Sequence, residues 1–152
     1  MNNMPLYLHF LYSSLATAGF AVFLNAPKST LIPSGVVGGI GWTFYKFLSI
    51  VTGNNIISDF IATSIITFLS EFLARKLKQP AIIFIIPGII TLVPGLGLYN
   101  TMLYLVQKDY SNAISKGCDV LFVAGAISLG VLIISSLVKT FNLVFIKKTG
   151  SK

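Results

Sequence analysis

Long apolar runs separated by short polar breaks are the feature that most constrains this chain. The runs cover about residues 6–24, 31–51, 56–73, 80–106 and 118–137. A helix needs about 20 predominantly apolar residues to cross the hydrocarbon core of a membrane, and each run has roughly that length. The sequence therefore predicts an all-α, polytopic integral membrane protein. We expect about five transmembrane helices, forming a single transmembrane domain over residues 1–152.

The scarcity of charge excludes a water-soluble enzyme. Charged residues make up 10% of the 152 residues, whereas a typical soluble domain carries about 25%. The net charge of +7 does not indicate nucleic-acid binding, because the basic residues lie singly or in short groups at the ends of the apolar runs. A nucleic-acid binder needs a basic stripe on one solvated face. The expected surroundings are a lipid bilayer, and no nucleic acid is expected as a partner.

The distribution of lysine and arginine predicts the orientation, because cytoplasmic loops are enriched in these residues. With five crossings and the N-terminus outside, eight basic residues fall inside and three outside. If the fourth apolar region were re-entrant, the split would become six against five. The larger asymmetry favours five crossings of a bacterial inner membrane, with the N-terminus outside and the C-terminus cytoplasmic.

The fourth apolar region is interrupted by two Pro-Gly pairs, Pro87-Gly88 and Pro94-Gly95. Proline removes a backbone donor and clashes with the carbonyl one turn earlier, and the glycine after it loosens the chain further. We therefore expect two breaks in this span. Backbone groups freed by such breaks cannot face lipid, so they must be covered by protein or line a wet cavity.

A broken span of this kind has two interpretations. Interrupted helices build substrate and ion sites in many transporters, and the polar residues Tyr99, Asn100 and Thr101 follow the second break. These three residues and the two Pro-Gly pairs are then candidates for substrate binding. The alternative is a pair of structural kinks between packed helices.

The four acidic residues have structural and functional interpretations. Glu71 precedes Arg75 by one helical turn, which is the favourable order for a salt bridge, but it is also a candidate proton relay at the inner mouth. Asp59 is expected in the first turn of the third span, where a negative charge complements the helix dipole. Asp109 is expected to cap the helix that follows it, and Asp119 to pair with a nearby lysine.

Other motifs predict packing rather than chemistry. The glycine-rich stretch from Gly35 to Trp42 has no preceding strand and lies within an apolar span, so a nucleotide site is excluded. Gly35 and Gly39 instead form a small-xxx-small step for close helix packing. His9 lacks acidic partners and Cys118 lacks a second Cys or His. We expect no catalytic residues, no metal site and no cofactor.

The order and spacing of several motifs resemble the threonine/serine exporter family over about residues 6–140. The resemblance rests on the run from Gly19 to Lys28, Gly35, Gly38, Gly41-Trp42, Ser70-Glu71, Ala74-Arg75, Ile86-Pro87-Gly88, Leu92-Val93-Pro94-Gly95, Tyr99, Thr101-Met102 and Ala124-Gly125-Ala126. Asn25, within the first of these runs, joins the candidate substrate-binding residues.

The resemblance implies a specific role and a partner. Split members of that family pair a larger membrane subunit with a small five-span subunit, and this chain is similar to the small one. The family implies efflux of threonine and serine driven by the proton gradient, while some split relatives export succinate. A structural subunit that only stabilises a transporting partner is the remaining alternative.

Overall fold

The chain folds entirely into helices in the residues that its computed structural model describes, 5–149, with side chains described as far as Phe141. The helices are α1 (Leu6–Phe23), α2 (Lys28–Thr52), α3 (Asn55–Leu77), α4 (Ile82–Ile90), α5 (Gly95–Val106) and α6 (Tyr110–Thr149). No strand occurs in this part of the chain, so the predicted all-α class is confirmed.

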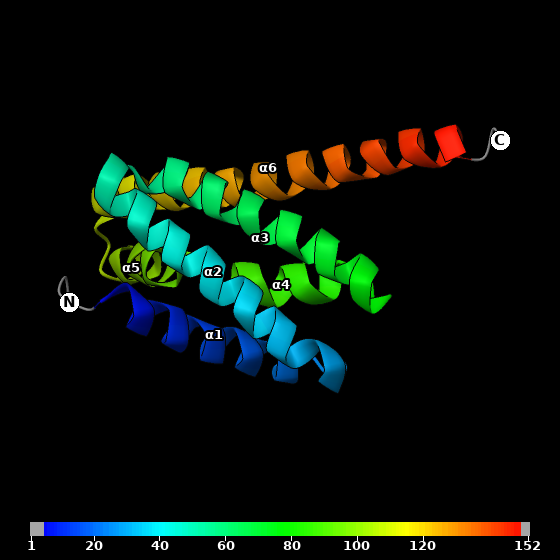
Figure 1. Cartoon of the computed structure of the whole chain (residues 1–152). Helices are drawn as coiled ribbons and strands as arrows, with labels where there is room; N and C mark the ends of the chain where they lie inside the picture. The colour runs from blue at the N-terminus through cyan, green and yellow to red at the C-terminus, as the bar shows by residue number, and fades with distance from the viewer. Residues whose placement is uncertain (1–4, 150–152) are drawn as a thin grey trace.

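The helices run back and forth between two ends of one elongated bundle (Figure 1). α2 packs between α1 and α3, α6 lies along α3, and α4 fits against α1, α2 and α3. α5 contacts α6. The start of α1 and the end of α6 lie at opposite ends of the bundle (Figure 1).

The helices differ in their suitability to cross a membrane. Within the described residues, α1, α3 and the part of α6 from Tyr110 to Phe141 are long and apolar enough, and α4 with α5 adds a fourth span if the bent pair counts as one. α2 has 25 residues but carries many glycine, serine and threonine residues. It is therefore long enough to cross, at about 1.5 Å per residue, but less apolar than the others. The protein is a polytopic membrane protein.

Polar residues and glycines set the helix ends at the turn between α2 and α3. Gly53 ends α2 in the left-handed conformation with φ of 63°, which glycine adopts without steric cost. The Asn54 side chain accepts hydrogen bonds from the amides of Ile56 and Ile57 and so caps α3. Asp109 caps α6 as predicted, accepting from the Asn112 amide at 3.3 Å.

α6 is longer than predicted. The expected span at 118–137 lies inside a helix of 40 residues, Tyr110–Thr149. No proline interrupts this stretch, and helical hydrogen bonds continue through the polar residues at both ends. At about 1.5 Å per residue the helix exceeds the roughly 30 Å of a hydrocarbon core, so it extends beyond one crossing. The predicted pair of Lys116 and Asp119 forms near its start, at 3.4 Å.

The expectation of two helix breaks in the fourth region is wrong. α4 continues through Pro87, and the break lies at residues 91–94, before α5. α4 and α5 are bent by 55° there. Proline removes only its own amide bond from the ladder, and Pro87 and Gly88 are buried. Their backbone is therefore covered by neighbouring helices, and the helix persists.

Small residues allow close helix contacts, as the small-xxx-small step of Gly35 and Gly39 predicts. A Cβ atom built at Gly35 would lie 2.9 Å from the Ser14 carbonyl oxygen of α1, and one at Gly130 would lie 3.0 Å from the Phe60 oxygen of α3. At these glycines the backbone of α2 lies close to that of α1, and the backbone of α6 lies close to that of α3.

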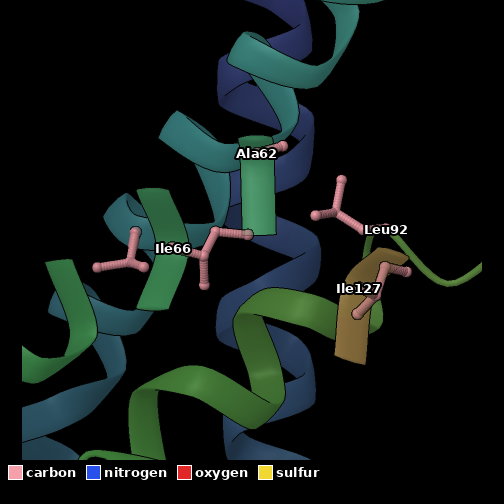
Figure 2. Packing of buried hydrophobic residues seen from close by; sticks show 5 residues of the cluster. Ala62, Ile66, Leu92 and Ile127 are labelled. Atoms are coloured by element: carbon pink, nitrogen blue, oxygen red, sulfur yellow. The ribbon is translucent and has the colours of Figure 1, made fainter. Parts of the chain in front are cut away.

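The apolar core is small and the exterior is strongly apolar. Val37, Ala62, Ile66, Leu92 and Ile127 form the buried cluster. Figure 2 draws the cluster and labels four of its residues, which come from α3, α6 and the helix break. Large apolar side chains such as Phe23, 81% exposed, cover the outside. A monomeric soluble protein rarely exposes so much apolar surface, so this exterior suits lipid and neighbouring membrane subunits.

Candidate functional site

The break between α4 and α5 leaves backbone amides free. The Gly95 amide donates to the Val93 oxygen at 2.7 Å and the Leu98 amide to the Pro94 oxygen at 3.0 Å. In the described part of the chain, the amides of Leu96 and Gly97 donate to no protein acceptor. Pro94 causes this arrangement because it has no amide of its own and disfavours the helical conformation of Val93.

A pocket of about 450 Å³ lies at this break. This volume is within the usual range for small-molecule sites, about 300–1,000 Å³. α2, α3 and α6 supply its other walls. The lining residues are Trp42, Tyr45, Asn55, Asp59, Val123 and the continuous stretch from Thr91 to Gly97.

Asp59 is the one charged residue of this lining. The residue is 3% exposed, and its Oδ1 atom has no hydrogen-bond partner among the described residues. The expectation that Asp59 lies in the first turn of its helix is wrong, since α3 begins at Asn55 and its first turn holds no acidic residue. Capping by Asn54 starts the helix early enough to place Asp59 in the second turn, on the buried face.

A row of buried hydroxyl groups continues from Asp59 along the same face of α3. Thr63, Thr67 and Ser70 follow at steps of four, four and three residues, which keeps them on one side of a helix, and all three are fully buried. The Thr67 hydroxyl donates to the Thr63 carbonyl at 2.8 Å. The hydroxyls of Thr63 and Ser70 have no partner among the described residues, so they remain able to bond a ligand or water.

The structure brings only part of the predicted binding set to the pocket. Pro94 and Gly95 line it. Tyr99, Asn100 and Thr101 lie further along α5, outside the lining. Tyr99 is 63% exposed, and the Thr101 hydroxyl donates to the Gly97 carbonyl at 2.8 Å.

The remaining candidates lie elsewhere in the bundle. Pro87 and Gly88 are buried within α4, where a Cβ on Gly88 would lie 2.8 Å from the Ile66 side chain. Asn25 is exposed in the turn between α1 and α2, with φ of 55°. It precedes α2, so Trp42 lies roughly 20 Å along that helix. Glu71 is half-buried, 12 residues or about 18 Å beyond Asp59 on α3.

Sequence reasoning missed Trp42, Tyr45, Asn55, Asp59 and Val123 as parts of the site. Asp59 had a usable signal, because it begins the polar row at helical spacing within an otherwise apolar span. Trp42 and Tyr45 had no such signal, because two aromatic residues three positions apart on a helix are also typical of ordinary packing. Their ring centroids lie 5.2 Å apart, and the ring planes are tilted by 36°. No group of three or more potential metal ligands occurs in the described residues.

The comparison with protein families identifies the family of this chain. The family model described as Threonine/Serine exporter, ThrE, matches residues 9–137. The chain belongs to the threonine/serine exporter family. The resemblance inferred from the sequence motifs is confirmed.

Two curated relatives are similar to this member of the threonine/serine exporter family. An uncharacterized protein of Haemophilus influenzae is 24% identical over 84% of this chain and 46% of its own length. A threonine/serine exporter of Corynebacterium glutamicum is 26% identical over 87% of this chain and 27% of its own length. The chain thus spans less than half of the one and about a quarter of the other. No solved structure matches.

Proposed function

We propose that this chain is a membrane subunit of a two-component exporter of small polar metabolites, threonine and serine in the first place, driven by the proton gradient. The observation that carries the proposal is the helix break that borders a pocket of about 450 Å³, whose mostly apolar lining contains the buried carboxyl group of Asp59. Interrupted spans supply binding sites near the middle of many transporters. A purely structural subunit has no evident need for a buried carboxylate beside such a break.

The hydroxyl row on α3 supports a path beyond the pocket. Thr63 and Ser70 have hydroxyl groups without partners among the described residues, although such groups in helices commonly bond the carbonyl one turn earlier. Leaving them unpaired inside the bundle is costly unless they meet water or a ligand. Glu71 follows Ser70 directly, and we assign it the role of a proton relay at the inner mouth.

A larger membrane subunit of the same family is the proposed partner. α5 has no buried residue, and Leu96 beside the break is 80% exposed. Free backbone amides next to such a surface need protein cover in a bilayer. The relatives also extend well beyond the matched region, which fits an activity that needs more than these helices.

The proposed location is the bacterial inner membrane, with the N-terminus outside. Two turns are expected on the cytoplasmic side. One contains Lys28 at the start of α2, and the other contains the basic group from Arg75 to Lys78 at the end of α3. The pocket then lies toward the outer side, near the turn that joins α2 and α3.

Accessibility labelling should confirm this orientation. In a Cys118→Ser background, Ser29→Cys should react only from the cytoplasmic side and Ser111→Cys only from the outside. Both serines are exposed near helix starts, and serine to cysteine is a small change. Labelling Ser111→Cys only from the cytoplasm would show that α4 and α5 form a re-entrant loop. Reversal at both sites would invert the orientation.

Reconstitution should show that transport needs both subunits. We expect efflux of labelled threonine from liposomes that hold this chain and its partner, under an imposed proton gradient, and no efflux with either subunit alone. Labelled serine and succinate in the same vesicles rank the substrates. Glu71→Gln should lower the gradient-driven efflux at an unchanged amount of protein. Full efflux with this chain alone would contradict the two-component proposal.

A further inference from the structure

The pocket at the helix break has walls of opposite electrostatic character. Asp59 of α3 contributes a carboxylate, and the start of α5 contributes backbone amides. The other lining side chains from α2 and α6 are Trp42, Tyr45 and Val123, which carry no positive charge. The pocket thus has one acidic wall and one wall formed by a helix N-terminus.

The burial of Asp59 requires a partner. A carboxylate withdrawn from water costs several kcal/mol unless a cation or hydrogen-bond donors replace its hydration. Asp59 is 3% exposed, and its Oδ1 atom has no partner among the described residues. Lys46 lies outside the lining, with its Nζ atom 5.9 Å from the centroid of the Trp42 ring. A cationic group entering the pocket would therefore find an unpaired carboxylate.

The start of α5 is suited to an anion. α5 has 12 residues, and a helix N-terminus carries a partial positive charge and free amides. The Leu96 and Gly97 amides have no acceptor in the described chain. A Cβ atom at Gly95 would meet nothing within 4 Å, so the chain is open at that residue, whereas a Cβ atom at Gly97 would lie 2.6 Å from the Val120 side chain.

We propose that Asp59 and the first turn of α5 bind the two charged groups of one small zwitterion. The ammonium group binds the Asp59 carboxylate, and the carboxylate group binds the amides of Leu96 and Gly97. This assignment rests on the proposed export function and adds the residues and the charge requirement of its site. A dicarboxylate would place a second negative charge beside Asp59, so the site selects α-amino acids over succinate.

Binding to the intact two-subunit complex in detergent, without any gradient, tests the charge requirement. The probe is labelled L-threonine, with N-acetyl-L-threonine, L-threonine methyl ester and succinate as competitors. Each competitor lacks one of the two charges or carries the wrong one. Removing one partner from a buried charge pair should weaken binding at least about thirtyfold, so all three should compete that much less well than threonine. Equal competition by succinate would overturn the proposal.

Substitution then tests the residue. Asp59→Asn should weaken threonine binding by at least about thirtyfold, while Asp119→Asn, which alters an exposed acid of α6, should leave it unchanged. Unchanged threonine binding to Asp59→Asn would refute the assignment. If that variant binds threonine normally but no longer exports it, Asp59 carries a proton and does not bind the substrate. If Asp59→Asn fails to fold, the competition series on the unaltered complex decides. Absence of threonine binding and efflux in the unaltered complex would instead refute the export function itself.

Discussion

Replacing Pro94 with alanine should lower threonine efflux at least about tenfold without lowering the amount of folded protein. Pro94 has no amide and biases Val93 away from the helical conformation, and these two effects keep the chain non-helical at residues 91–94. Alanine there permits α4 to continue into α5, so the amides of Leu96 and Gly97 become bonded within the helix. Loss of even one amide bond to a charged ligand is worth about 1.5–3 kcal/mol, which corresponds to about tenfold or more.

The matched control is Pro33→Ala, which removes a proline inside α2 and away from the pocket lining. It should leave efflux close to that of the unaltered protein. Pro87→Ala separates the two Pro-Gly pairs: because α4 is already continuous through Pro87, this change should keep the bend. Efflux from reconstituted vesicles at matched protein levels measures all three. Full activity of Pro94→Ala would show that the break has no part in transport.

Adding one methyl group at Gly38 should destabilise the bundle. A Cβ atom there would collide with Thr17 of α1, coming within 2.7 Å of its Cβ and 2.6 Å of its Cγ2 atom. Thr17 is fully buried, so it has little room to move. Overpacking of this kind costs about 1–3 kcal/mol. Because the colliding Thr17 atoms lie next to the backbone, we expect a cost near the upper end of this range, which exceeds the gain of about 1 kcal/mol in helix propensity over glycine.

Gly19→Ala is the control for this change, because Gly19 lies on α1 with open space around its Cα atom. The same methyl group there should leave stability unchanged or raise it slightly. The apparent melting temperature in detergent, measured by size-exclusion chromatography after heating, should fall by about 4–8 °C for Gly38→Ala. Equal melting temperatures for the two variants would refute the close contact between α1 and α2.

Local sequence patterns were sufficient for the helices near the chain's start. The span expected at 6–24 matches α1, and the spans expected at 31–51 and 56–73 lie within α2 and α3. Apolar length and turn residues such as Gly53 and Asn54 act over a few neighbouring positions, so they can be identified without knowing the fold. The end of α6 was not predicted, because no local signal such as proline marks where that helix stops.

Two similar motifs gave different outcomes because their surroundings differ. Pro87-Gly88 and Pro94-Gly95 have the same local chemistry, yet only the second lies at a break. Pro87 and Gly88 are both buried, and Gly88 packs against Ile66 of α3. We infer that this packing holds the helix together. Gly95 is exposed, with nothing near its Cα atom. Packing between distant segments decides this difference, and adjacent residues do not encode it.

The sequence alone determined that the chain lies in a membrane, that it is helical and that its fourth span is interrupted, because apolar length and proline act locally. Only the tertiary structure decided which residues share a site. Trp42 and Tyr45 of α2, Asp59 of α3 and Pro94 of the break are far apart in the chain, and they meet because α2 and α3 pack antiparallel while α4 bends into α5. The role of Asp59 depends on burial, and burial is a property of the packed bundle.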